Sequence, residues 1–342
     1  MGKLARFLKT MVEMVPGFRW FKPGQGPTTR RRRVNVALQG GGALGAFTWG
    51  VLDRLLESRH VRITAASGAS AGAMNATLLA SGLVRGGPEA ARARLEGFWR
   101  DAARAGSGPM GQSGMVRAMT ALFNPALSGG SSETNLRQLV DRHVDITALC
   151  DSASVPLVIA ATDLKTEQAE LFRNADITLP VLMASACLPL LHRPVEINGR
   201  LYVDGGLSLN PPLLSLIEES PADETLLIRI LPTGIGGESA RPFAQAMDSA
   251  QMLFNRGLIG ELDQYHRLKK LSTEVKPAPD TLLARIQNHR LSQIDGAAHM
   301  PLGTFSQALN PNMQLVETLF RLGRNAAEAW LATDARERAP DV

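Results

Sequence analysis

Short apolar runs alternate along this chain with longer stretches of helical periodicity. The runs that predict buried strands are VNVALQ (34–39), VRITAAS (61–67), VPLVIAATDL (155–164) and TLLIRILP (225–232), with further candidates at 169–174 and 201–206. Helical patterns extend over 43–58, 71–83, 241–272 and 312–334. Strands that alternate with helices in this way are typical of a parallel sheet covered by helices. The pattern therefore predicts an α/β fold with a mainly parallel central sheet.

The first 33 residues differ in character from the rest of the chain. KLARFLKTMVEMV (3–15) has apolar residues on one helical face and mostly basic residues on the other, and 16–33 is loop-like and ends in four arginines. The sequence predicts three parts: a basic amphipathic leader and linker at 1–33, a core at 34–232, and a mostly helical extension at 233–342 packed on the same domain. The Gly-, Ser- and Met-rich segment 105–132 is either a surface loop or a lid over an apolar pocket.

Positive charge is concentrated in this leader. Residues 1–33 hold nine Lys or Arg and one Glu, whereas the rest of the chain holds 28 basic and 31 acidic residues; the whole chain carries +5. A slightly acidic body argues against nucleic acid as a partner. The leader has the composition of an anchor on anionic lipid, and the alternative is a helix packed on the protein's own surface.

Composition limits the remaining classes of protein. With 44% hydrophobic and 20% charged residues, the chain is typical of globular proteins. No apolar run reaches the roughly 18 residues of a membrane-spanning helix. Cys150 and Cys187 form neither a disulfide framework nor a metal pattern. We expect no metal, no cofactor and a cytoplasmic location, with the protein either free or peripheral on a membrane. The oligomeric state stays open.

The sequence Gly68-Ala69-Ser70-Ala71-Gly72 fits G-x-S-x-G between a predicted strand and a predicted helix. That is the context of a nucleophile elbow, in which a sharp turn presents the serine hydroxyl at a helix N-terminus. Small residues on both sides, with Gly68 and Gly72 at the two ends of the motif, allow the turn to form. Ser70 is therefore the candidate nucleophile of an acyl-transfer reaction.

A glycine triplet, Gly40-Gly41-Gly42, follows the first predicted strand. Consecutive glycines let backbone N–H groups converge on the oxyanion of a tetrahedral intermediate, and the Ala71 N–H is a further candidate donor. The same stretch also fits the dinucleotide fingerprint G-x-G-x-x-G through Gly45. That alternative requires an acidic residue near the end of the second strand, and 61–72 contains none.

Asp204-Gly205-Gly206 ends the predicted strand at 201–206. An acid at a strand end, followed by two glycines, is well placed to face a site. The alternative is a plain β-turn, because Asp-Gly is a common turn pair.

Together these motifs resemble the patatin-like phospholipase family. The resemblance rests on QGGGALGAF (39–47), SGASAGAMN (67–75), ATDL (161–164) and ASACLPLLHRPVEINGRLYVDGGLSLNPPL (184–213). It implies a three-layer α/β/α fold and hydrolysis of carboxylic esters of phospholipids or other lipids through an acyl-enzyme. It also implies a Ser-Asp dyad of Ser70 and Asp204, with an oxyanion loop at Gly40 to Gly42. Many members of the family carry a basic residue two places after the triplet, where this chain has Leu44.

Two other functions stay open on the sequence alone. The first is an α/β-hydrolase esterase with a Ser-Asp-His triad, in which the histidine follows the acid in the chain. His266, His289 and His299 meet that order, whereas His192 precedes Asp204. The second is a lipid-binding protein that keeps the fold without turnover.

Overall fold

The computed structural model describes residues 31–106, 131–151, 154–189, 192–220, 222–233, 242–301 and 311–337. The predicted leader helix at 3–15 lies outside the described residues. So does nearly all of the predicted loop or lid at 105–132. No described helix is both long and apolar enough to cross a bilayer.

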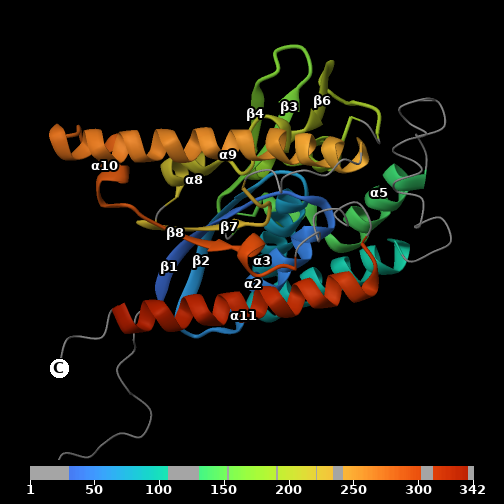
Figure 1. Cartoon of the computed structure of the whole chain (residues 1–342), viewed down its shortest axis with the longest axis horizontal. Helices are drawn as coiled ribbons and strands as arrows, with labels where there is room; N and C mark the ends of the chain where they lie inside the picture. Colours follow the sequence, from blue (N-terminus) through green and yellow to red (C-terminus); the bar gives the residue numbers. More distant parts are fainter. Residues whose placement is uncertain are drawn as a thin grey trace, which may run out of the picture. The chain divides into compact units, whose positions relative to one another are not determined.

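A central sheet of eight strands organises the fold (Figure 1). Its parallel pairs join β1 (Arg32–Leu38), β2 (Val61–Gly68), β3 (Leu157–Asp163), β7 (Glu224–Arg229) and β8 (Arg290–Asp295). Antiparallel pairing adds β4 (Ala169–Arg173), β6 (Arg200–Asp204) and β5 (Val195–Ile197). The hydrogen-bonded path runs β5-β6-β3-β2-β1-β7-β8, and β4 pairs with β3. The predicted mainly parallel sheet is confirmed.

Helices cover both faces of this sheet. One face carries α2 (Gly45–Glu57), α3 (Ala71–Gly106) and α11 (Met313–Glu337), and the other carries α8 (Leu213–Glu219), α9 (Pro242–Glu274) and α10 (Leu282–Asn288). In Figure 1, α9 and α11 lie on opposite sides of the strands. The structure thus has the predicted α/β/α layers.

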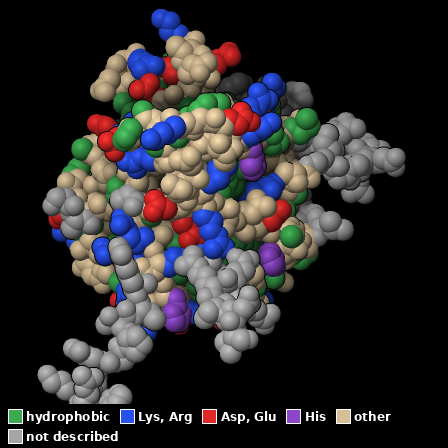
Figure 2. Space-filling model, turned by 90° about the vertical axis from the view of Figure 1, so that its left-hand side faces the viewer, with side chains coloured by type: hydrophobic (Ala, Val, Ile, Leu, Met, Phe, Trp, Pro, Cys, Tyr) green, Lys and Arg blue, Asp and Glu red, His purple; other side chains and the backbone are tan. Residues whose placement is uncertain are grey.

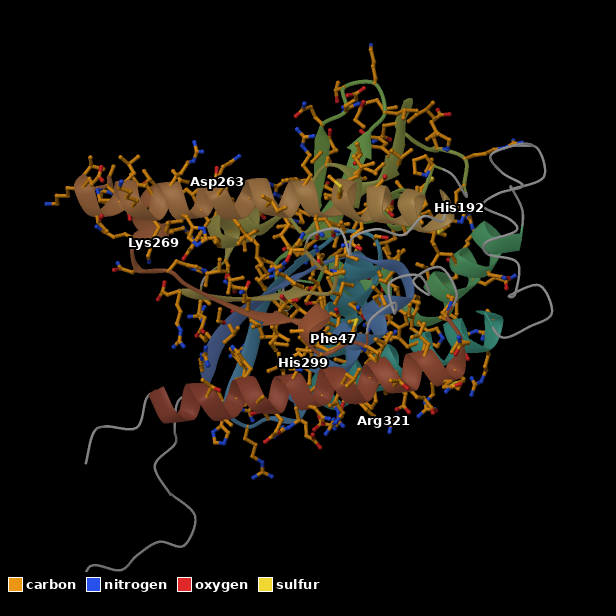
Figure 3. All side chains as sticks on the ribbon, viewed as in Figure 1. Phe47, His192, Asp263, Lys269, His299 and Arg321 are labelled. Carbon is orange, nitrogen blue, oxygen red and sulfur yellow. The ribbon has the colours of Figure 1, made fainter. Side chains whose placement is uncertain are left out.

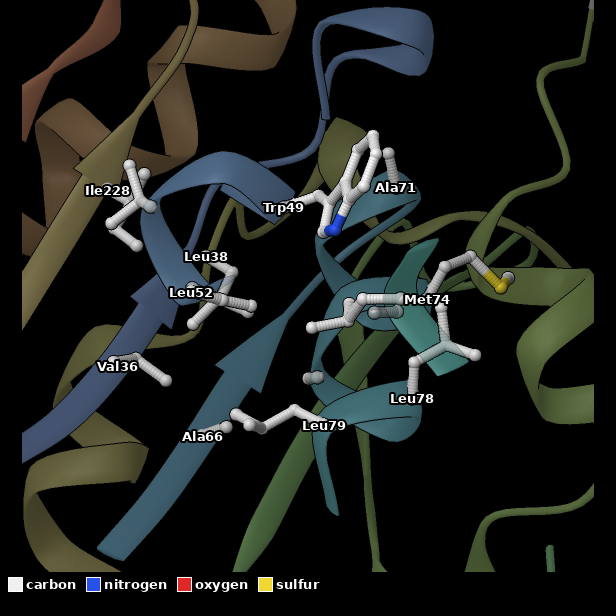
Figure 4. Packing of buried hydrophobic residues seen from close by; sticks show 14 of the residues in the cluster. Val36, Leu38, Trp49, Leu52, Ala66, Ala71, Met74, Leu78, Leu79 and Ile228 are labelled. Atoms are coloured by element: carbon white, nitrogen blue, oxygen red, sulfur yellow. The ribbon is translucent and has the colours of Figure 1, made fainter. Parts of the chain in front are cut away.

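The strand β1 shows how the two cores divide between the faces. Val36 and Leu38 belong to the larger apolar cluster with α2 and α3, whereas Ala37 belongs to the cluster with α8, α9 and α10. Figure 4 shows Leu52 of α2 and Leu79 of α3 in the same packed layer as Val36 and Leu38. Alternation along a strand sends neighbouring side chains to opposite faces, so both faces of β1 are buried.

The start of β1 differs from the sequence prediction. The strand begins at Arg32 rather than at residue 34, because Arg32 pairs in register with Val61 of β2. The Arg32 guanidinium forms an ion pair with Glu224 and lies 4.5 Å from the ring centroid of Trp330. The last arginines of the predicted leader therefore belong to the sheet.

The C-terminal extension contributes to the same body. It adds β8, which the sequence analysis did not predict, as a parallel strand beside β7. It also adds α11, which packs closely on α2. A Cβ on Gly50 would lie 2.1 Å from the Phe320 carbonyl oxygen, and one on Gly323 would lie 2.1 Å from the Phe47 carbonyl oxygen. Residues from Arg32 onward form one compact unit.

Several further elements were not predicted from periodicity. They are α5 (Ser131–His143), α6 (Ile146–Leu149), α7 (Leu179–Ser185), α10 and β5. The predicted helix at 71–83 continues as α3 to Gly106, with a break where Gly86 and Gly87 leave helical dihedrals. Short elements are stabilised mainly by tertiary packing, so their local patterns are weak.

Candidate active site

Ser70 occupies a sharp turn between β2 and α3. Its φ is 54°, in the left-handed region that non-glycine residues rarely adopt. The flanking glycines are needed for close approach: a Cβ on Gly68 would lie 2.4 Å from the Gly72 carbonyl carbon, and one on Gly72 would lie 2.1 Å from the Leu38 carbonyl oxygen. This is the strained strand–turn–helix geometry of a nucleophile elbow.

Asp204 ends β6, and β3 brings it to Ser70. One edge of β3 pairs with β4, at both Ile159 and Ala161. On the opposite edge, Ile159 pairs with Gly68 of β2 and Ala161 pairs with Asp204 of β6. β2 and β6 therefore follow one another along the same edge of β3, and their carboxyl ends meet there.

The Asp204 carboxylate is fully buried. Its Oδ1 accepts a hydrogen bond of 2.8 Å from the Gly206 N–H, whereas Oδ2 is buried without a hydrogen-bond partner in the described part of the chain. Burial raises the pKa of Asp204 to about 7, and the Gly206 N–H and the Ser70 hydroxyl act against that rise. The Ser70 hydroxyl thus lies near enough to influence the carboxylate but does not complete a hydrogen bond to Oδ2. Such contacts are often loose in unliganded enzymes.

The glycines after Asp204 make room for this arrangement. A Cβ on Gly205 would lie 2.0 Å from the Ala160 carbonyl oxygen, and one on Gly206 would lie 2.4 Å from the Phe254 ring. Asp204-Gly205-Gly206 is therefore packed against β3 on one side and α9 on the other.

The glycine triplet lies against the nucleophile. A Cβ on Gly40 would be 2.8 Å from the Ser70 Cβ. The Gly40 N–H is already engaged, because it donates to Asn210 Oδ1 at 2.6 Å. Within the described residues, no acceptor is recorded for the N–H groups of Gly41, Gly42 and Ala71. Of the four predicted oxyanion donors, these three are available to a ligand.

Two contacts at this site involve residues that sequence reasoning missed. Ser185, the last residue of α7, accepts from the Ser70 N–H through both its carbonyl oxygen and its hydroxyl, each at 3.1 Å. The Cys187 carbonyl oxygen accepts from the Asp204 N–H at 2.8 Å. The sequence did point to this region, because Ser185 and Cys187 both lie in the stretch 184–213 on which the family resemblance rests.

The histidines of the triad alternative lie in other surroundings. His289 is buried; its Nε2 lies 2.9 Å from Thr225 Oγ1, and burial lowers its pKa to about 4. His299 stacks on Phe47 with ring centroids 6.2 Å apart (Figure 3). His266 is exposed on α9 beside Tyr265. Within the described part of the chain, no histidine contributes to the shift in the pKa of Asp204.

Two features bear on charge at the site: the side chain at position 44 and the possible metal ligands. Leu44, two places after the glycine triplet, is fully buried in the apolar core and supplies no charge. The described residues contain no cluster of three or more His, Cys, Asp or Glu side chains that could hold a metal ion. On the face shown in Figure 2, Lys and Arg side chains are interspersed with Asp and Glu.

Comparison with known proteins identifies the group to which this arrangement belongs. The family model for patatin-like phospholipase matches residues 36–217, a range that includes the glycine triplet, Ser70 and Asp204. The chain belongs to the patatin-like phospholipase family. The family predicted from the sequence motifs is thus confirmed.

Similar proteins include uncharacterized NTE family proteins of Mycobacterium bovis and Mycobacterium tuberculosis. Each is 29% identical over 216 residues, which cover 63% of this chain and 52% of the relative. The chain thus spans about half the length of the curated relatives it matches. Among solved structures, VipD of Legionella pneumophila matches 91% of this chain and 72% of its own, with 14% identity and a TM-score of 0.35.

Proposed function

We propose that this protein is a lipid acyl hydrolase, a serine carboxylic-ester hydrolase of the phospholipase A kind, that uses a Ser70–Asp204 dyad. Membership of the patatin-like phospholipase family supports lipid hydrolysis in general. The observation that carries the finer proposal is the pairing of a strained Ser70 with a buried carboxylate whose Oδ2 has no hydrogen-bond partner among the described residues. A carboxylate with a pKa of about 7 is a better base than an ordinary aspartate and is still half ionised at neutral pH.

In the first half of the proposed reaction, Asp204 accepts the Ser70 hydroxyl proton while Oγ attacks the carbonyl carbon of the ester. The carbonyl oxygen becomes an oxyanion, stabilised by the N–H groups of Gly41, Gly42 and Ala71. Collapse of the intermediate breaks the bond to the alcohol, which leaves with the proton held by Asp204. The acyl chain then remains on Ser70 as an ester.

In the second half, Asp204 accepts a proton from a water molecule that attacks the acyl-enzyme. The same N–H groups stabilise the second oxyanion. When the intermediate collapses, the bond to Oγ breaks, Ser70 regains its proton from Asp204, and the fatty acid is released. Neither half requires a cofactor or a metal.

The proposal extends to the surface on which the substrate is presented. The basic amphipathic segment at 1–33 has the composition of an anchor on anionic lipid, and the helix predicted for 3–15 lies outside the described residues. We propose a lipid ester as substrate, an anionic membrane as the surface that binds the leader, and a cytoplasmic protein that is peripheral on that membrane.

Labelling with a fluorophosphonate, followed by intact-mass measurement, tests the proposed chemistry. We expect one adduct on the wild-type protein, none on Ser70→Ala, and slower labelling of Asp204→Asn. The matched control is Ser81→Ala, because Ser81 is a buried serine of α3, the helix that follows Ser70, and its hydroxyl donates to the Leu78 carbonyl oxygen at 3.3 Å. That variant is expected to label like the wild type.

Two results would contradict the proposal. Equal labelling of Ser70→Ala and wild type would remove Ser70 from the chemistry. A folded wild-type protein that acquires no adduct, with or without lipid vesicles, would favour the alternative of a lipid-binding protein without turnover.

A further inference from the structure

Asn210 is a fully buried amide that bonds to both polar backbone atoms of Gly40. The Gly40 N–H donates to Oδ1 at 2.6 Å, and Nδ2 donates to the Gly40 carbonyl oxygen at 3.2 Å. Nδ2 also lies 3.3 Å from the Phe254 carbonyl oxygen of α9. A buried amide that loses such partners costs free energy, so these bonds hold the first glycine of the triplet in one orientation.

This orientation matters because Gly40 touches the nucleophile. The close approach of Gly40 to the Ala69 carbonyl oxygen and the Ser70 Cβ leaves no space for a side chain. The Gly40 N–H is committed to Asn210, whereas the N–H groups of Gly41 and Gly42 that follow have no acceptor among the described residues and could face an oxyanion. The position of those donors relative to Ser70 therefore depends on where Asn210 holds Gly40.

Asn210 is also joined to the base by a short and well-packed stretch of chain. Asp204 begins this stretch and Asn210 ends it. In its middle, Gly206 packs against the Phe254 ring, and Phe254 supplies the carbonyl oxygen near Asn210 Nδ2. One segment thus carries the carboxylate at one end and the amide that orients the glycine loop at the other.

We propose that Asn210 is a positioning residue that sets the oxyanion loop relative to Ser70 and Asp204. It acts through Gly40 and does not itself touch the substrate. The inference rests on the proposed hydrolase function and extends it to a residue outside the dyad and the glycine motif.

The loop has a second anchor that lets the Asn210 contribution be measured. Gln39 Oε1 accepts from the N–H groups of Ile230 and Leu231 at 2.8 and 2.9 Å, and its Nε2 donates to Asn255 at 2.9 Å. These bonds do not involve Asn210. We therefore expect the loop to stay attached to β7 and α9 when Asn210 is changed, but to lose its precise placement.

The test compares Asn210→Ala and Asn210→Asp with Asn35→Ala and Asn35→Asp. Asn35 is an equally buried amide on β1, and it donates to the Ala222 carbonyl oxygen and to Thr225 Oγ1, each at 3.3 Å. It lies in the middle of the strand, away from the glycine loop. Both pairs of variants are expected to lower the free energy of unfolding, so stability alone does not separate the roles.

The rate of fluorophosphonate labelling and the split between kcat and KM on a soluble ester separate them. Complete loss of an oxyanion donor typically costs about 10²–10³ in rate, so we expect misplaced donors in the Asn210 variants to cost roughly 10–100-fold in labelling rate and kcat. KM should change little, because the loss falls on the transition state. The pH midpoint of activity of Asn210→Ala should match that of the wild type, because that change adds no titratable group.

The outcomes distinguish this inference from the proposed function. A wild-type protein that acquires no label would contradict both the proposed hydrolase function and the positioning role of Asn210. A wild type that labels at Ser70, with Asn210 variants that label as fast as the Asn35 variants, overturns the positioning role alone. If Asn210→Ala fails to fold, the labelling rate of Asn210→Asp is compared with that of Asn35→Asp instead, because Asn210→Asp keeps the side-chain size and the Oδ1 acceptor.

Discussion

The backbone N–H of Ser70 donates to the carbonyl oxygen and to the hydroxyl of Ser185, each at 3.1 Å. Two residues further on, the Cys187 carbonyl oxygen accepts from the Asp204 N–H. The last residue of α7 and the segment directly after it therefore hold both members of the proposed dyad through their backbones. They oppose relaxation of the strained φ at Ser70 and fix the spacing between nucleophile and base.

Ser185→Ala tests this arrangement. The change removes the hydroxyl acceptor and keeps the carbonyl acceptor, so we expect about 1 kcal/mol lower stability. Looser placement of Ser70 should also slow fluorophosphonate labelling by several-fold. Ser81→Ala removes a comparable buried hydroxyl from α3 and should leave the labelling rate unchanged. Equal labelling rates for the two variants would contradict the role of Ser185.

The pH dependence of activity should report Asp204. Only the ionised carboxylate accepts the Ser70 proton, and burial raises its pKa to about 7. We therefore expect kcat/KM on a soluble, non-ionising ester to rise with pH and to reach half its plateau near pH 7. A plateau already reached at pH 5 would show that the carboxylate ionises as readily as an exposed aspartate.

Asp204→Asn should slow the reaction at Ser70 and make the protein more stable in alkaline solution. Because the pKa of Asp204 is raised in the folded state, its contribution to stability is full below about pH 4 and is lost as pH rises through about 7. The neutral amide avoids this loss. At pH 8 we expect the variant to exceed the wild type in free energy of unfolding by about 4 kcal/mol, with the gain vanishing near pH 4. Denaturant titrations at both pH values measure it, and a gain that does not depend on pH would contradict it.

Gly40→Ala should abolish activity for a steric reason. Its Cβ would lie 2.3 Å from the Ala69 carbonyl oxygen, so the loop or the elbow must move. We expect at least about 100-fold slower labelling, comparable to the loss of an oxyanion donor, with roughly 1–3 kcal/mol lower stability. Gly260→Ala on α9 is the control, because a Cβ there meets nothing within 4 Å. It should label normally and gain up to about 1 kcal/mol of stability.

Deletion of residues 2–30 tests the proposed membrane anchor and leaves β1 intact from Arg32. We expect weaker binding to vesicles that contain anionic lipid and unchanged turnover of a soluble ester. Sedimentation with vesicles of anionic and of zwitterionic composition measures the difference. Unchanged binding to anionic vesicles would contradict the proposal that the leader is a membrane anchor.

The sequence by itself determined the α/β class, the family and the chemical candidates. These rest on local requirements: apolar strands between helices, small residues around Ser70, consecutive glycines after β1, and an acid at a strand end before two glycines. Each is visible within a few residues, because the physical demand acts within a single turn or strand. The strand β8 was not predicted because its sequence, RLSQID, has little of the apolar pattern of a buried strand. It forms a strand by pairing with β7.

Only the tertiary structure decided how the candidates work together. The meeting of Ser70 and Asp204 depends on β2 and β6 sharing an edge of β3, and the pKa of the carboxylate depends on complete burial. The hydrogen bonds from Ser70 to Ser185 and from Gly40 to Asn210 join residues that are 115 and 170 positions apart in the chain. Spacing along the chain contains no information on such contacts, because they exist only once the sheet has assembled and its loops lie side by side.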